Sequence, residues 1–336
     1  MSFRIAADIM GGDNSPLTLA GGAVSAGREF GARIILVCTE EVKNQLPYYG
    51  ADVRVVTADC FVEMTDDPSV VMKEKKNASM CVACALCKNG EADAVVSAGN
   101  TGALFTTASL TVRRIKGVRR AALCSVIPLE KPFLMLDCGA NLDATPEIMR
   151  LYARMGSIYA HGVLGVSEPR VALLNNGTEP HKGIPLYADT FKLLSEDKSI
   201  NFIGNIEGKA LPTGACDVLV CDGFTGNLVL KTIEGMGSFM RKTIKDIFSG
   251  GLLSLTAGAL TLKKTKALKK RLDVKEYGGA PFLGLAKPVI KAHGSSNSYA
   301  FRSAVRTAID YCACGAIDEI ANSIKHCSED AIGGEQ

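Results

Sequence analysis

Short apolar segments alternate along the chain with longer segments whose apolar residues recur at helical spacing. This alternation predicts β–α–β units, in which right-handed crossovers join neighbouring parallel strands. The expected fold class is therefore α/β, with a three-layer, Rossmann-like parallel or mixed sheet. Strands are expected at Phe3–Asp8, Arg33–Cys38, Val53–Thr57, Ala94–Ser97, Ala122–Pro128, Phe133–Asp137, Arg170–Asn175, Asn201–Gly204 and Asp217–Cys221, and from Val289 onward.

Proline residues mark several helix starts. Pro16 and Pro146 follow polar turns and are expected to open helices, because proline is favoured at the first helical position. The Asp66-Asp67-Pro68 segment is a third start signal. It predicts one continuous helix from Pro68 to Lys88, which Gly90 ends.

The composition is that of a folded α/β protein. The 336 residues include 34 glycines and are 47% hydrophobic, which is typical of many short connections around a large core. A formal net charge of +3 is too small to predict nucleic acid as a partner. We expect a single α/β domain over residues 1–333, with a helical tip at about residues 247–272.

Neither an apolar signal segment after Met1 nor an apolar stretch long enough to span a membrane is visible, so a cytoplasmic protein is expected. Its 12 cysteines are then expected to be reduced thiols. Cys81, Cys84 and Cys87 have the spacing that begins an iron–sulfur ligand run, but the next residues lack the further Cys and Pro. We expect no metal and no cofactor.

The loop after the strand Ala94–Ser97 is the first candidate anion site. Ser97-Ala98-Gly99-Asn100-Thr101-Gly102-Ala103 leads from a strand into a helix, so hydroxyls, backbone N–H groups and the positive helix end converge there. Ser97, Gly99, Asn100 and Thr101 are the candidate phosphate-binding residues. The alternative is that small residues are needed only for the geometry of the turn.

Polar residues also follow other predicted strands. Asp8, Asp137, Asn205 and Asp222 stand with Ser97 at five strand ends. If all five strands are parallel, their carboxyl ends share one edge, and the five tips line one cleft. Further amide and hydroxyl groups follow at Asn141, Thr225 and Asn227.

Two later loops contain charged and polar residues that are candidates for the active site. Residues 176–183 contain Glu179, His181 and Lys182, which suit a general base or phosphate contact, although such loops are often simply solvated. Residues 291–296 end a strand and form a second candidate anion cradle, with Lys291, His293, Ser295 and Ser296. For His293 we favour substrate positioning over activation of Ser295, since neighbouring residues rarely point at each other correctly. A structural histidine is the alternative.

Residues 248–262 contain no charge and are followed by a cluster of lysines ending at Arg271. An apolar tip with a basic collar suits an interfacial membrane helix, because apolar burial and attraction to anionic lipid add. The alternative is a helical hairpin that packs on a dimer partner.

Eight collinear motifs together resemble the bacterial phosphate acyltransferase (PlsX) family over about residues 3–325. The sequence departs from that pattern at Arg120-Ala121, where Pro commonly follows Arg, at Asn297, where Asp is common, and in its cysteine content. The motifs are Asp8-x-Met10-Gly11-Gly12-Asp13, Ser97–Ala103, Leu136-Asp137-x-Gly139-Ala140-Asn141, Gly177-Thr178-Glu179, Gly204-Asn205-x-Glu207, Asp222-Gly223-Phe224-Thr225-Gly226-Asn227, Tyr277-Gly278-Gly279-Ala280 and Lys291-Ala292-His293-Gly294-Ser295-Ser296.

The resemblance implies transfer of a long acyl chain from acyl carrier protein to inorganic phosphate, an early step of phospholipid synthesis. It also implies a fold similar to the phosphotransacetylases and the isopropylmalate and isocitrate dehydrogenases, and a homodimer. Peripheral membrane contact through Leu252–Arg271 is a further expectation, as is a membrane glycerol-3-phosphate acyltransferase as partner. Nucleic acid is not expected as a partner.

We expect phosphate to lie between the Ser97–Gly102 and Lys291–Ser296 loops. The candidate catalytic residues are Lys182, His293, Asn141 and Asn227, and Asp137, Asn205, Asp222 and Thr225 complete the substrate-binding set. Three alternatives are a phosphotransacetylase acting on short acyl-CoA, a nicotinamide-dependent dehydrogenase and a membrane-surface scaffold. The dehydrogenase is disfavoured because the chain lacks a convincing G-x-G-x-x-G and a carboxylate cluster suited to Mg²⁺.

Overall fold

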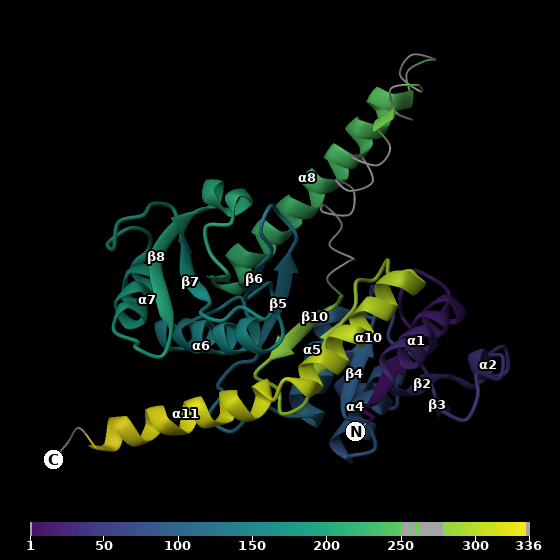
Figure 1. Ribbon diagram of the computed structural model, residues 1–336. Helices are drawn as coiled ribbons and strands as arrows, with labels where there is room; N and C mark the ends of the chain where they lie inside the picture. Colours follow the sequence, from purple (N-terminus) through teal and green to yellow (C-terminus); the bar gives the residue numbers. More distant parts are fainter. Residues whose placement is uncertain (1, 250, 252–255, 257–259, 262–277, 334–336) are drawn as a thin grey trace.

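An 11-stranded mixed sheet organises the computed structural model, which describes residues 2–249, 251, 256, 260, 261 and 278–333 (Figure 1). Its strand order is β3-β2-β1-β4-β11-β10-β5-β6-β9-β7-β8. Most of the expected tip at residues 247–272 lies outside the described residues. The strands are β1 Arg4–Asp8, β2 Arg33–Thr39, β3 Val53–Ala58, β4 Ala94–Ser97, β5 Ala122–Ile127, β6 Phe133–Leu136, β7 Arg170–Asn175, β8 Asn201–Glu207, β9 Val218–Val220, β10 Ala280–Leu283 and β11 Val289–Lys291.

Helices cover both faces of this sheet, so the expected three-layer α/β fold is confirmed. One face packs against α1, α6, α7, α10 and α11, and the other against α4, α5 and the first half of α8. The helices are α1 Pro16–Phe30, α2 Glu40–Lys43, α3 Val70–Lys73, α4 Ser79–Lys88, α5 Thr101–Thr111, α6 Pro146–Gly162, α7 Pro185–Ser195, the 3₁₀ turn Gly208–Thr213, α8 Gly223–Ser249, α10 Ser298–Ala313 and α11 Ala316–Gly333.

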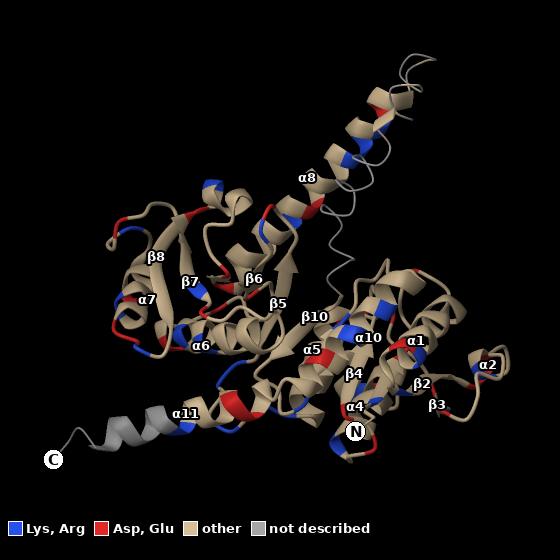
Figure 2. Cartoon of the chain, in the orientation of Figure 1, with Lys and Arg blue, Asp and Glu red and all other residues tan. Residues whose placement is uncertain are grey.

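Successive side chains along a strand point to opposite faces of the sheet, so strands that are apolar throughout make both faces apolar. In β6, Leu134 and Leu136 face one core cluster while Phe133 and Met135 face the other. In Figure 2 the central strands β4, β5, β6 and β10 are without charged residues, whereas α8 carries cations and anions along its length. Strands buried on both faces are typical of sheets with helices on each side.

The predicted helix from Pro68 to Lys88 is wrong as one element, because residues 74–78 interrupt it. Ala78 forms a β-bridge with Cys60, and the N–H of Ser79 donates to the carbonyl oxygen of Cys60 at 2.9 Å. This tertiary pairing outweighs the local helical pattern, so the chain forms α3 and α4 separately. Cys84 and Cys87 are buried in α4 as small apolar residues.

The expectation that five strand tips share one edge is also wrong, because three successive pairs in the middle of the sheet, β11–β10, β10–β5 and β5–β6, are antiparallel, so β6 runs opposite to β11. Strands β1, β4 and β11 therefore end at one edge of the sheet, which we call the first edge. Strands β6, β7, β8 and β9 end at the opposite, second edge. Asp8 and Ser97 lie at the first edge, and Asp137, Asn205 and Asp222 lie towards the second.

Helix α8 connects the two edges. It begins at Gly223, directly after β9, and its first turn packs against the loop that follows β6. The N–H of Gly223 donates to the carbonyl oxygen of Asn141 at 3.1 Å. A Cβ atom on Gly226 would lie 1.9 Å from the carbonyl oxygen of Asp137 and 2.8 Å from Sγ of Cys221. The glycines therefore let the helix approach this loop closely.

We predict that Gly226→Ala lowers the free energy of unfolding by about 1–3 kcal/mol, because the added methyl group overpacks a rigid contact. Gly235→Ala on the same helix is the matched control, since its Cβ would meet no heavy atom of the described chain within 4 Å. That variant is expected to gain up to about 1 kcal/mol through helix propensity. Chemical denaturation measures the change in the free energy of unfolding for both variants. A Gly226→Ala variant as stable as the unchanged protein would contradict the close contact.

Candidate active site

A cavity of about 660 Å³ lies at the first edge of the sheet, between α8 and the loop that follows β11. Its size falls in the range of small-molecule sites. Residues between 231 and 241 of α8 form one wall, and His293, Ser295 and Ser296 form the opposite wall. Pro128 and Leu129, which follow β5, and Pro212 also line the cavity.

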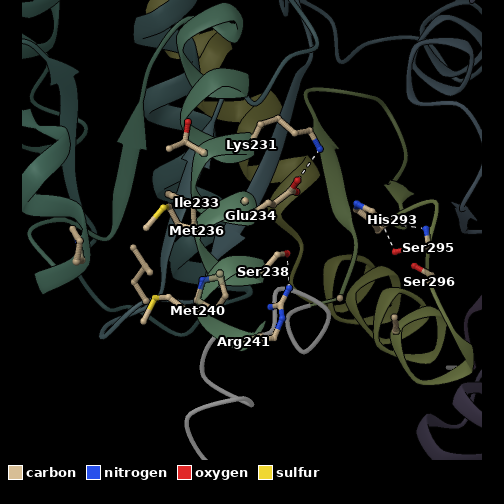
Figure 3. Close-up of a pocket in the computed structure, with 18 residues that line it drawn as sticks. Lys231, Ile233, Glu234, Met236, Ser238, Met240, Arg241, His293, Ser295 and Ser296 are labelled. Atoms are coloured by element: carbon tan, nitrogen blue, oxygen red, sulfur yellow. Dashed lines mark hydrogen bonds and ion pairs between the residues drawn. The ribbon is translucent and has the colours of Figure 1, made fainter. Parts of the chain in front are cut away.

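The face of α8 that looks toward His293 is polar (Figure 3). Lys231, Glu234, Ser238 and Arg241 are spaced by three, four and three positions, so they lie along one side of the helix. Nζ of Lys231 lies 2.8 Å from Oε2 of Glu234, and Nη2 of Arg241 donates to Oγ of Ser238 at 2.9 Å. Two cations on this wall therefore border the cavity.

The opposite wall orients His293 through its ring nitrogen Nδ1. The backbone N–H of Ser295 donates to Nδ1 at 3.1 Å, and Oγ of Ser295 lies 2.9 Å from the same nitrogen. An Nδ1 that accepts a backbone N–H leaves the proton of a neutral imidazole on Nε2. The expectation that His293 and Ser295 would not point at each other is therefore wrong. Asn14 supports this loop by donating to the carbonyl oxygens of Ser295 and Ser296.

A buried polar group lies beneath this wall, at the ends of β1, β4 and β11. Oγ of Ser97 donates to Oδ2 of Asp8 at 2.6 Å, and both residues are fully buried. Burial raises the pKa of Asp8 to about 6, although hydrogen bonds from Ser97, Ser79 and the Met10 N–H oppose the rise. The carboxyl group is therefore partly protonated at mildly acidic pH.

Lys291 is the buried cation of this group. Its Nζ donates to the carbonyl oxygens of Ala98, at 3.2 Å, and of Ala292. Burial lowers the pKa of Lys291 to about 8, against the opposing charge of Asp13, and Lys231 lowers it further. The charge of Lys231 on the α8 wall therefore acts on the buried polar group beneath the opposite wall.

The hydrogen-bonding groups of the Ser97–Ala103 loop are used within the protein. Oγ of Ser97 accepts the N–H of Gly99 at 3.1 Å besides donating to Asp8. Asn100 caps α5 by accepting the N–H of Ala103, and its amide donates to the carbonyl oxygens of Met64 and Asp66. This geometry favours a supporting loop; phosphate contact by Ser97, Gly99, Asn100 and Thr101 stays a prediction.

Most of the remaining predicted residues lie in a second polar group, at the second edge, and none of them lines the cavity. Oδ1 of Asp137 accepts the N–H groups of Leu123, Gly139 and Ala140. Oδ2 accepts both the backbone N–H and the amide of Asn141. Burial nevertheless raises the pKa of Asp137. This carboxylate thus organises the loop against which α8 packs.

Asp222 and its neighbours hold the start of α8. Burial alone would raise the pKa of Asp222, but hydrogen bonds from the Tyr187 hydroxyl and from Thr225 lower it below the usual range. The hydroxyl of Tyr187 donates to the Asp222 carboxylate, and Oγ1 of Thr225 donates to it at 2.7 Å. Asn227 lies one turn further on, where a Cβ added to Gly139 would meet its side chain at 3.2 Å.

Lys182 and Asn205 lie near each other at this second edge. The amide of Asn205 donates to the carbonyl oxygen of Glu179 at 2.9 Å, and Asn175 donates to that of Lys182 at 3.0 Å. Asn205 lies within β8 rather than at its end, because that strand continues to Glu207. Among the described side chains, Oδ1 of Asn205 and Oδ1 of Asn141 are buried without a hydrogen-bond partner.

The α8 wall is the part of the site that sequence reasoning missed. The signal was the spacing of Lys231, Glu234, Ser238 and Arg241, which places them on one helical face. A polar face of this kind is equally typical of a solvated helix, so the spacing alone does not identify a cavity wall.

We predict a pH-dependent stability effect at Asp8. Its folded pKa of about 6 lies above the ordinary 3.8, so the folded protein binds more protons between about pH 4 and pH 6. The contribution of this group to the free energy of unfolding is complete below about pH 4 and is lost as the pH rises through 6. The stability difference between the unchanged protein and Asp8→Asn is expected to fall by up to about 3 kcal/mol from pH 4 to pH 7.

Urea denaturation across this pH range measures the difference. Asp246→Asn, which alters an exposed carboxylate on α8, is the control and is expected to show no comparable trend. A difference for Asp8→Asn that stays constant with pH would contradict the assignment.

Comparison with known proteins identifies the family. Residues 3–318 match the family model described as "Fatty acid synthesis protein". A protein of Desulfitobacterium hafniense named phosphate acyltransferase is 45% identical over 328 residues, covering 96% of this chain and 98% of the relative. One of Brevibacillus brevis with the same name is 44% identical over 311 residues, covering 91% and 92%.

The fold is also that of a solved phosphotransacetylase from Streptococcus pyogenes. The two structures superpose with a TM-score of 0.63 at 15% identity, over 93% of this chain and 94% of the other. This likeness confirms the expected fold class. The family match and the identity to full-length relatives together show that the chain belongs to the fatty acid synthesis protein family of phosphate acyltransferases.

Proposed function

We propose that this protein transfers the acyl group of a long-chain acyl thioester, carried by acyl carrier protein, to inorganic phosphate. The product is an acyl phosphate, formed early in phospholipid synthesis. One observation supports this function above the others: Lys231 and Arg241 border a cavity whose opposite wall presents His293 and the Ser295–Ser296 turn. The site thus has positive charge, which suits an anion, beside an apolar wall, which suits an acyl chain. The names and high identity of the relatives support the same reaction.

The reaction needs few chemical groups from the protein. A phosphate oxygen attacks the thioester carbonyl, a C–O bond forms, and the C–S bond breaks as the electron pair leaves on sulfur. The proton that the attacking hydrogen phosphate loses ends on the thiolate, so the products are acyl phosphate and the free thiol of the carrier. A thiolate is a good leaving group, and the main task is to hold two reactants together and to stabilise the developing oxyanion.

The geometry suggests how residues around the cavity share this task. Lys231 holds the phosphate on the α8 side, Arg241 adds positive potential from about 15 Å further along the helix, and Nε2–H of His293 donates to the oxyanion or to a phosphate oxygen. Lys291 adds positive potential from beneath, and Ser295 and Ser296 border the reacting groups. Lys291 is protonated below about pH 8, so its contribution weakens at alkaline pH.

We assign a different role to the second polar group. Asp137, Asn141, Asp222, Thr225 and Asn227 hold the first turn of α8 and thereby set where Lys231 lies. They act as positioning residues in this scheme. For Lys182 and Asn205, reactive roles stay predictions.

The wider setting follows from the family resemblance. We propose a cytoplasmic homodimer with peripheral membrane contact and a membrane glycerol-3-phosphate acyltransferase as a partner. Among the described residues, no helix has the length and apolar character needed to cross a bilayer. Light scattering and vesicle co-sedimentation test the dimer and the membrane contact.

The proposed reaction is tested with long-chain acyl-[acyl-carrier-protein] and phosphate, by measuring thiol release and acyl phosphate. We predict that Lys231→Met raises the KM for phosphate roughly 10- to 100-fold, the range expected for loss of a charged hydrogen bond. Lys245→Met, on the exposed part of α8, is the matched control and is expected to keep the original KM.

Two outcomes would overturn these assignments. Absence of phosphate-dependent thiol release from the unchanged protein would refute the reaction, and rapid turnover of acetyl-CoA with phosphate would favour the phosphotransacetylase alternative. An unaltered phosphate KM in Lys231→Met would remove that residue from the site.

A further inference from the structure

Helix α8 contains two glycines, Gly235 and Gly237, in the middle of its cavity-lining section. A glycine inside a helix costs about 0.5–1 kcal/mol relative to alanine, so two of them need an explanation. Close packing does not provide one at Gly235. An added Cβ there would meet no heavy atom of the described chain within 4 Å.

The two glycines lie at the borders between two faces of the helix. At about 100° per residue, Gly235 lies next to Lys231, with Phe239 and Thr232 at the angles between it and Met236, and Gly237 lies between Ile233 and Arg241. The polar face with Lys231 looks toward His293, while Ile233, Met236 and Met240 project to the other side (Figure 3). Both faces line the same cavity. The cavity therefore extends past α8 at positions that have no side chain.

The far side of the cavity is apolar. Ile233, Met236 and Met240 from α8 lie there (Figure 3), and Leu129 and Pro212 are further apolar residues that line the cavity. Met236 and Met240 are 53% and 41% exposed, so apolar surface is left uncovered there. Methionine side chains are flexible and adapt to apolar ligands of different length.

We propose that this apolar part of the cavity is the subsite for the alkyl chain of the acyl thioester, and that Gly235 is the bare section of wall past which a long chain runs. The inference rests on the proposed function and deepens it, because it assigns the site of chain recognition. The thioester head group stays between Lys231 and His293. The alkyl chain passes Gly235 and lies against Ile233, Met236, Met240 and Leu129, where burial of each methylene stabilises the complex. A side chain at position 235 then shortens the space available to the chain.

The test is the series Gly235→Ala and Gly235→Leu, assayed with hexadecanoyl and octanoyl carrier protein. The ratio of kcat/KM for hexadecanoyl over octanoyl is expected to fall about tenfold or more in Gly235→Leu, and less in Gly235→Ala. Thr243→Leu, on the same helix outside the cavity, is the control and is expected to keep the ratio of the unchanged protein. Thermal unfolding verifies that each variant is folded.

A binding measurement separates this inference from the reaction itself. Calorimetry with the non-reactive hexadecanoyl thioether of pantetheine is expected to show binding to the unchanged protein and at least tenfold weaker binding to Gly235→Leu. Equal losses for both chain lengths, or an unchanged ratio and unchanged thioether affinity, would overturn the subsite. If the unchanged protein lacks phosphate-dependent turnover but Gly235→Leu weakens thioether binding, the reaction is refuted and the subsite stands.

Discussion

The close contact between the first turn of α8 and the loop after β6 is the constraint on which the candidate site depends. Asp137 holds that loop by accepting four backbone N–H groups and the amide of Asn141. Gly223 and Gly226 let the helix backbone approach it without a steric clash. A long helix anchored this tightly at one end has little freedom in direction. Residues two to five turns later are thus placed opposite the His293 loop.

The reversal of strand direction between β11 and β6 makes this anchor important. Because the three successive pairs β11–β10, β10–β5 and β5–β6 are antiparallel, β6 runs opposite to β11, and the polar tips of the sheet divide between two opposite edges. Of the five polar tips, Asp8 and Ser97 lie at the edge with the cavity, together with the end of β11. Helix α8 starts at the second edge and runs to the first edge, where its polar face lines the cavity. One helix thus joins two groups of polar residues that strand ends alone do not bring together.

The sequence predicted much of the local structure because its signals are local. Alternating apolar segments identified the strands other than β10, and Pro16 and Pro146 marked the starts of α1 and α6. The loop expected to cradle an anion, with His293, Ser295 and Ser296, lies beside a cavity, and its contact with an anion stays a prediction. Strand direction was not predictable, since pairing between distant segments decides it. The break before α4 depends likewise on a bridge between Cys60 and Ala78.

The central claim is that the acyl substrate occupies the cavity between α8 and the His293 loop. Photolabelling with a pantetheine thioester whose alkyl chain ends in a diazirine tests it directly, with peptide mapping of the labelled sites by mass spectrometry. The account predicts adducts on α8 at residues 232–240 and on Leu129, competed by unlabelled hexadecanoyl thioester. Adducts confined to residues 137–142, 176–184 or 222–227, at the second edge, would contradict it.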